Sequence, residues 1–175
     1  MKNFIEKFVL TEEPIDTENL KKAANLICRE YGEDLCLQIL IEEISEVLEV
    51  MSVNPVESIT TEGRYNLIEE ISDVKLFATI VHQRFHSQPN VIPKGEAKDL
   101  EPVQQLFYYA ARAIYFVSKY TRIGGIRNIG IALGYLDRLV DGVAILYNIP
   151  STDIDKGVTV KVGRAIDRCI EGGIH

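Results

Sequence analysis

Hydrophobic residues recur along most of the chain at spacings of three and four, which places them on one face of an α-helix. Leu20, Ala23 and Ile27 begin this pattern near the N-terminus. The spacing predicts helices over about 17–31, 33–52, 64–86, 102–120, 126–147 and 150–169. Strand-like alternation is confined to 158–162, where a buried helical turn accounts equally well for the β-branched residues. We therefore expect an all-α fold, a helical bundle of five or six helices in one domain over residues 1–175.

Glycine, proline and polar residues mark the connections between these helices. Gly32 ends the first helix, and the proline- and glycine-containing stretch 87–100 predicts a long connection before the fourth. A short turn is expected at 121–125. Ser151 or Thr152 is expected to be the N-cap of the last helix, because a hydroxyl there accepts a bond from a free backbone N–H.

The charge and cysteine content exclude several classes of protein. A net charge of −7 over 175 residues argues against a general nucleic-acid binder, which carries a basic face. No apolar run approaches the roughly 20 residues that span a membrane. The three cysteines, Cys28, Cys36 and Cys169, are odd in number and lack zinc-ligand spacing, so we expect reduced thiols in a cytoplasmic protein. An acidic protein can still bind phosphates if metal ions neutralise them.

One acidic motif occurs twice. Residues 40–46 read LIEEISE and residues 67–73 read LIEEISD, on two successive predicted helices. In each copy one acid follows another by three residues, Glu43 with Glu46 and Glu70 with Asp73. Residues three apart share a helix face, so two such helices packed antiparallel bring four carboxylates to one place.

Four converging carboxylates repel one another unless a cation lies between them. No Lys or Arg occurs between Arg29 and Arg64, whereas a solvated acidic face, the alternative interpretation, normally intersperses basic residues. We therefore predict a metal site. No Glu is followed by a His three residues later, which disfavours a di-iron bundle site, and zinc-type His or Cys ligand spacing is missing. An all-carboxylate site favours Mg²⁺, with Mn²⁺ as a substitute, and the predicted ligands are Glu43, Glu46, Glu70 and Asp73.

The two motifs together resemble those of the MazG-like all-α nucleoside triphosphate pyrophosphohydrolases. The matching residues are Glu42-Glu43-Ile44-Ser45-Glu46 and Glu70-Ile71-Ser72-Asp73, and the similarity covers about residues 17–86. The resemblance implies Mg²⁺ ions that bridge the phosphates, attack of water at the α-phosphorus, and release of monophosphate and pyrophosphate. Glu42 or Glu43 would orient or deprotonate that water. The resemblance also implies sites shared between subunits, hence a homodimer or homotetramer.

The resemblance is compatible with several nucleotide substrates. A phage-type enzyme would use dGTP or dATP, and other members of the superfamily use dUTP, dCTP or phosphoribosyl-ATP. A non-enzymatic oligomerisation or regulatory module, whose acids bind a basic partner, is a further alternative. Residues 87–150 add two helices to the minimal family pattern, which leaves their role undetermined.

Basic residues on the last predicted helix are candidates for phosphate binding. Lys161, Arg164 and Arg168 recur at spacings of three and four, and the family tends to carry basic residues near its chain end. A solvated basic face near a helix C-terminus is the alternative. Lys75, close to the second motif, is expected either to contact phosphate or to balance charge.

Two further features have plain structural explanations. Gly130 and Gly134 lie four apart and fit no phosphate-binding loop, so they predict close helix packing. The predicted fourth helix carries an aromatic stripe, which we interpret as core or subunit interface, with a base-stacking wall as the alternative. Its members are Phe107, Tyr108, Tyr109, Tyr115, Phe116 and Tyr120.

Overall fold

Six α-helices make up most of the computed structural model, which describes residues 13–93 and 95–170. They are α2 (Thr17–Tyr31), α3 (Glu33–Val53), α4 (Thr61–Phe85), α5 (Pro102–Ile123), α6 (Ile126–Leu146) and α7 (Ser151–Ile170), with a short 3₁₀ turn, η1 (Val56–Ser58), between α3 and α4. The described residues contain no strand, and 158–162 lies inside α7. The predicted all-α bundle is confirmed. None of the described helices is long and apolar enough to cross a lipid bilayer.

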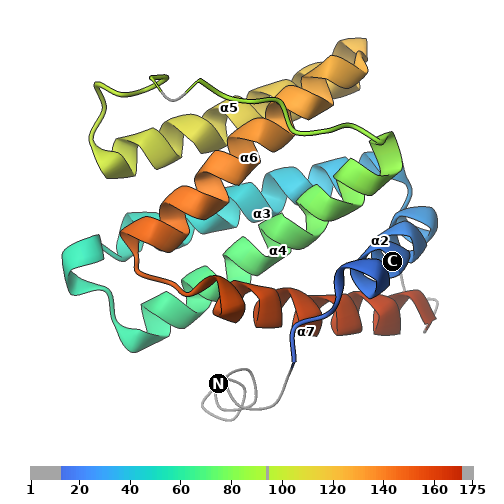
Figure 1. Cartoon of the computed structure of the whole chain (residues 1–175), viewed down its shortest axis with the longest axis horizontal. Coiled ribbons are helices and arrows are strands. Elements are labelled where there is room, and N and C mark those ends of the chain that lie inside the picture. Colours follow the sequence, from blue (N-terminus) through green and yellow to red (C-terminus); the bar gives the residue numbers. More distant parts are fainter. Residues whose placement is uncertain (1–12, 94, 171–175) are drawn as a thin grey trace.

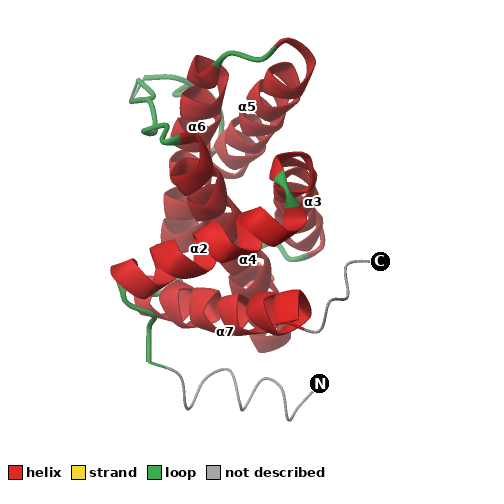
Figure 2. Ribbon diagram, turned by 90° about the vertical axis from the view of Figure 1, so that its right-hand side faces the viewer, coloured by secondary structure: helices red, strands yellow, loops and turns green. Residues whose placement is uncertain are grey.

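The helices pack in three layers (Figures 1 and 2). α3 and α4 form the middle layer, the α5–α6 hairpin covers one side of it, and α2 and α7 cover the other. α4 contacts α2, α3, α6 and α7, and it is therefore the central helix. One continuous core, to which all six helices contribute buried side chains, joins the layers, with Ile27, Leu40, Ile71 and Leu139 among its members.

Local hydrogen bonds determine where several helices begin. Gly32, with φ of +82°, ends α2 and allows α3 to start directly after it. Thr60 caps α4 by accepting a 3.0 Å hydrogen bond from the Gly63 amide, so α4 begins three residues before the predicted start. The predicted N-cap of α7 is wrong. Ser151 and Thr152 both lie inside the helix, because the carbonyl of Pro150 already accepts bonds from the amides of the first turn.

The glycines of α6 allow a close approach, but the partner is not a helix. The Asn90 amide donates a 2.8 Å hydrogen bond to the Gly130 carbonyl. A Cβ atom at Gly130 or Gly134 would collide with the backbone of the connection that follows α4. The extended segment therefore lies directly on α6, which corrects the expectation of helix–helix packing at these glycines.

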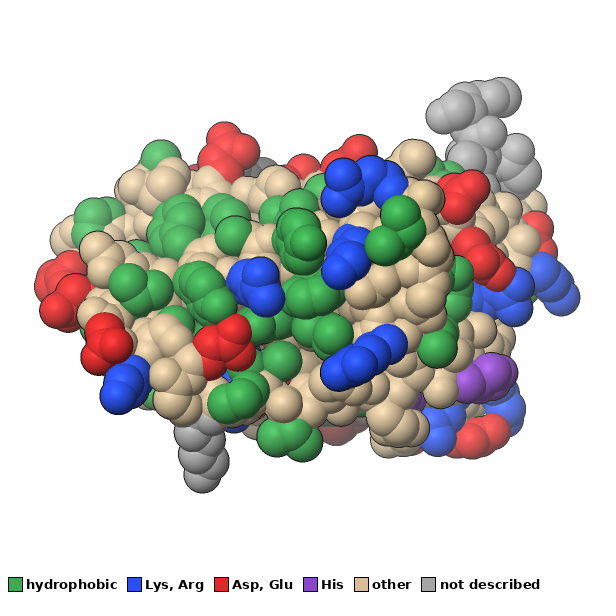
Figure 3. All heavy atoms as spheres, turned by 90° about the horizontal axis from the view of Figure 1, so that it is seen from above, with side chains coloured by type: hydrophobic (Ala, Val, Ile, Leu, Met, Phe, Trp, Pro, Cys, Tyr) green, Lys and Arg blue, Asp and Glu red, His purple; other side chains and the backbone are tan. Residues whose placement is uncertain are grey.

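The aromatic stripe of α5 is half-buried against α6. Phe116 stacks on Tyr135 with ring centroids 6.1 Å apart, and the Arg112 guanidinium lies 4.9 Å from the Phe116 ring. On the outer face, seen in Figure 3, hydrophobic side chains gather over α5 and α6. Phe107 and Tyr115 are among the exposed ones.

Candidate functional site

The two copies of the acidic motif face each other across the middle layer. α3 and α4 run antiparallel, joined by η1 and short connecting segments. In this register Glu46 lies beside Glu70, and Glu43 interacts with Asp73. The sequence motif and the antiparallel packing together bring these acids to one place.

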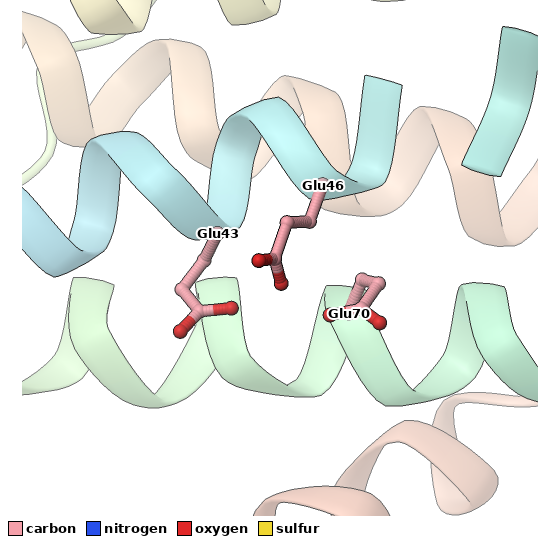
Figure 4. A group of neighbouring side chains, drawn as sticks. All are labelled: Glu43, Glu46 and Glu70. Atoms are coloured by element: carbon pink, nitrogen blue, oxygen red, sulfur yellow. The ribbon is translucent and has the colours of Figure 1, made fainter. Parts of the chain in front are cut away.

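Three carboxylates converge between α3 and α4. Figure 4 shows Glu43 and Glu46 reaching from α3 toward Glu70 on α4. One oxygen from each of the three lies within 4.8 Å of the others. Two oxygens that bind the same Mg²⁺ ion lie about 3 to 4 Å apart, given metal–oxygen distances of about 2.1 Å. Small side-chain rotations would therefore bring all three onto one hard cation, so the donor set fits Mg²⁺ or Mn²⁺.

Among the described residues none of these three carboxylates forms an ion pair, and the nearby Lys161 only partly offsets their mutual repulsion. Burial, with added repulsion from Asp73 and Glu46, raises the pKa of Glu43 to about 8. Burial and the hydrogen bond with Glu46 raise the pKa of Glu70 to about 7. Both shifts favour a proton on the carboxyl, and a divalent cation is the other means of neutralising it.

Asp73 stands apart from the group of three. Its carboxylate accepts a hydrogen bond from the Lys161 ammonium of α7, and Lys161 also lies 3.2 Å from a carboxylate oxygen of Glu69. The side chains of Asp73 and Lys161 are each 12% exposed, so this pair is largely removed from water. Burial raises the pKa of Asp73 although Lys161 opposes the shift. The predicted fourth ligand is thus beside the site but already paired with a cation.

The other predicted phosphate contacts fall into two groups. Arg164 donates a 3.1 Å hydrogen bond to Glu69, and Arg168 lies exposed at the rim of the same pocket. Lys75 instead donates a 2.7 Å hydrogen bond to Asp155 and lines a separate cavity between α4 and α6. Lys75 therefore lies outside the acidic pocket, because it occupies a different face of α4.

The acids and the basic residues line one pocket of about 450 Å³, which lies within the roughly 300 to 1,000 Å³ of small-molecule sites. Helices α2, α3, α4 and α7 all contribute to it. Glu42 lines it with an exposed side chain, and the members of the α5 aromatic stripe do not line it.

Sequence reasoning missed some residues of this pocket. Glu69, the ion-pair partner of Lys161 and Arg164, was overlooked although the EE doublet of the second motif contains it. Tyr31, Ile39 and Phe77 form an apolar wall, and their places in the hydrophobic pattern give no sign of a ligand site.

No protein-family model matches the chain, and comparisons with curated proteins and with solved structures also give no match. The resemblance to MazG-like enzymes accordingly rests on the two motifs alone.

Proposed function

We propose that this protein hydrolyses nucleoside or deoxynucleoside triphosphates to the monophosphate and pyrophosphate, with Mg²⁺ held by Glu43, Glu46 and Glu70. The observation that carries the proposal is the convergence of these three carboxylates in a pocket that also contains Lys161 and Arg164. In a metal–polyphosphate complex the metal is positive and the phosphates are negative. The acidic group suits the metal, and the nearby Lys161 and Arg164 suit the phosphates.

The metal would neutralise charge on the phosphates and activate a water molecule for attack on the α-phosphorus. Mn²⁺ would serve as a substitute, since it accepts the same oxygen ligands. Glu42 lines the pocket without belonging to the group of three, so its carboxylate is available to accept a proton from the attacking water.

Lys161 and Arg164 would bind the phosphates that leave as pyrophosphate. Both cations are held in the pocket by Glu69, which fixes their position before substrate arrives. Lys161 also pairs with Asp73, so Asp73 would position Lys161, and it would be available as a metal ligand only if Lys161 moved to a phosphate. Arg168 would contact substrate from the rim.

A nucleotide screen tests the proposal. The protein is incubated with Mg²⁺ and each common NTP and dNTP, including dGTP, dATP, dUTP and dCTP, and the products are separated by chromatography. We expect monophosphate and pyrophosphate in equal amounts from at least one of them, and no product in EDTA. Diphosphate and orthophosphate would identify a different cleavage point. Absence of products, together with no thermal stabilisation by Mg²⁺ plus nucleotide, would instead favour a non-enzymatic helical module.

We also propose that the protein forms a homodimer or homotetramer in a reducing, cytoplasmic environment. Exposed hydrophobic side chains on α5 and α6, among them Ile123 (72% exposed) and Ile126 (50% exposed), support a contact with a second copy. The free cysteines, Cys28 and Cys36 among them, support a reducing compartment. Light scattering coupled to size-exclusion chromatography tests the assembly, and a monomeric mass would contradict it.

A further inference from the structure

A second cavity lies against another face of α4, between this helix, α6 and the chain that follows α4. Its volume of about 520 Å³ is within the range of small-molecule sites, and the proposed reaction gives it no role. Its lining divides into an apolar wall and a set of polar groups. Leu133 and Leu136 are buried members of the wall, which Ala78, Pro89 and Val140 complete.

The His82 ring gives this cavity a hydrogen-bond acceptor. Its Nδ1 atom lies 2.8 Å from the carbonyl oxygen of Ser87, and because a carbonyl can only accept, Nδ1 carries the hydrogen. Nε2 of the neutral ring then has a lone pair and no hydrogen. Within the described residues Nε2 has no hydrogen-bond partner. The ring is therefore fixed in the tautomer that can accept a hydrogen bond from a ligand.

Two carboxylates of α6 line the same cavity. Asp137 and Asp141 lie one helical turn apart, and neither forms an ion pair within the described part of the chain. Partial desolvation and repulsion from Asp141 raise the pKa of Asp137 despite nearby basic groups, so its charge is only partly compensated. Lys75 is the one cation among the lining residues that the structure describes, and it is already paired with Asp155 at 2.7 Å.

The polar lining thus accepts hydrogen bonds more readily than it donates them. The Thr79 hydroxyl gives its hydrogen to the Lys75 carbonyl, at 2.8 Å, and keeps its lone pairs for the cavity. Gln88 is exposed at the rim and adds a carbonyl oxygen. A negative, acceptor-rich lining beside an apolar wall complements a ligand that has N–H donors, a positive charge and a hydrocarbon part. A phosphate does not fit such a lining.

The acceptors lie at two places along the apolar wall. Ser87, whose carbonyl holds the His82 ring, packs against Gly130 near the start of α6. Asp137 follows Gly130 by seven residues, or about 10 Å along the helix. A four-carbon chain with an amine at each end, and with a hydrogen bond of about 3 Å beyond each amine, spans a separation of this order.

We propose that this cavity binds a small alkyl diamine. One ammonium group would lie beside Asp137 and Asp141, in charge-assisted hydrogen bonds, and the other would donate to Nε2 of His82. The carbon chain would cover Leu133 and Leu136. The cavity is separate from the acidic pocket, so this proposal is independent of the proposed hydrolysis.

Titration calorimetry with 1,4-diaminobutane tests the proposal, with Mg²⁺ in excess so that amines compete poorly for the acidic pocket. The bis-trimethylammonium analogue keeps the chain and both charges but has no N–H group. Asp137→Asn removes one charge, and His82→Asn keeps a donor to Ser87 but removes Nε2. Asp99→Asn is the matched control, because Asp99 is exposed and lines neither cavity.

Methyl NMR of the wild-type protein locates the ligand without any substitution. Leu136 and Val140 report on this cavity, and Leu76 reports on the acidic pocket. We expect the diamine to shift the methyl signals of Leu136 and Val140 and to leave those of Leu76 unchanged. Shifts confined to Leu76 would place the diamine in the acidic pocket and overturn the proposal.

In calorimetry we expect saturable binding of one diamine per chain. Asp137→Asn should weaken it at least about tenfold and His82→Asn at least about threefold, since each removes an acceptor. The bis-trimethylammonium analogue should bind at least about tenfold more weakly, and Asp99→Asn should bind like the wild type. No saturable binding, equal binding of the analogue, or undiminished binding by Asp137→Asn would overturn the site.

Discussion

The two copies of the acidic motif have six identical letters but different surroundings. In the α3 copy Glu42, Ser45 and Glu46 are exposed, and no ion pair to this copy occurs within the described residues. In the α4 copy Ser72 and Asp73 are buried. α7 packs on α4 and supplies Lys161 and Arg164 to that copy.

The difference shows how one motif takes two roles. The α3 copy contributes carboxylates that form no ion pair within residues 13–93 and 95–170, which suits metal binding. The α4 copy contributes Glu70 to the same group and uses Glu69 and Asp73 to hold cations. Helix packing, and not the motif itself, decides which acids are available to a metal.

The largest expected effect comes from removing an acid of the converging group. Glu46→Gln, in the α3 copy, and Glu70→Gln, in the α4 copy, should each lower pyrophosphate release at least about 100-fold, because each removes one proposed metal ligand. Glu49→Gln, an exposed acid of α3 outside the pocket, is the control and should keep wild-type activity. Steady-state kinetics with Mg²⁺ measures the rates. Wild-type activity of Glu46→Gln or Glu70→Gln would show that the substituted residue is not a metal ligand.

The next largest effect concerns Lys161 of α7, whose ion pairs are with Glu69 and Asp73 of the α4 copy. Lys161→Met should lower the free energy of unfolding by about 2 to 3 kcal/mol, since it leaves the largely buried Asp73 carboxylate without its cation, although Glu69 keeps its pair with Arg164. Lys75→Met is the matched control, and it should lose no more than about 1 kcal/mol because its pair with Asp155 is partly exposed. Urea unfolding measures the loss of stability in both variants. Equal losses would contradict the claim that the buried Lys161 pair contributes more than the partly exposed Lys75 pair.

Without metal, the protein should become less stable as pH rises. The folded-state pKa of Glu43 is raised from 4.5 to about 8, so between these values the folded carboxyl keeps a proton that the unfolded chain releases. Stability is therefore lost as pH rises through this window. Urea unfolding in EDTA from pH 5 to pH 8 measures the slope, which Glu43→Gln should reduce and Mg²⁺ should offset. A slope unchanged in Glu43→Gln would show that this carboxyl is not responsible.

The smallest effect distinguishes the two serines of the motif. The Ser72 hydroxyl shares its one hydrogen between the carbonyl oxygens of Ile68, at 2.6 Å, and Ile154, at 3.2 Å, and the second contact joins α4 to α7. Ser72→Ala should cost about 1 kcal/mol of unfolding free energy. The exposed Ser45 hydroxyl bonds only to the Ile41 carbonyl of its own helix, so Ser45→Ala should change stability by less than about 0.5 kcal/mol. Thermal unfolding of both variants tests this, and a reversed order would contradict the burial difference.

The sequence predicted the helices well because each buries one continuous stripe at helical spacing. Its errors lie at the helix ends, where Thr60 starts α4 early and where α7 already begins at Ser151, directly after Pro150. The convergence of Glu43, Glu46 and Glu70 could be predicted, because the motif repeats on two successive helices that a short connection makes antiparallel.

Other features of the site depend on contacts between helices distant in sequence. The spacing of α7 does not show that Lys161 would reach Asp73, which lies 88 residues earlier. Lys75 is only two residues from Asp73, yet it points to another cavity, because successive positions of a helix face different directions. Tyr31, Ile39 and Phe77 look like ordinary core residues until the four helices surround one pocket.

One measurement tests the central claim most directly. The protein, Mg²⁺ and the nucleotide with the highest rate in the screen are incubated in ¹⁸O-labelled water, and the products are analysed by mass spectrometry. The account predicts one ¹⁸O atom in the nucleoside monophosphate and none in the pyrophosphate, with no turnover in EDTA. Label in the pyrophosphate, turnover that persists in EDTA, or no turnover of any triphosphate would contradict it.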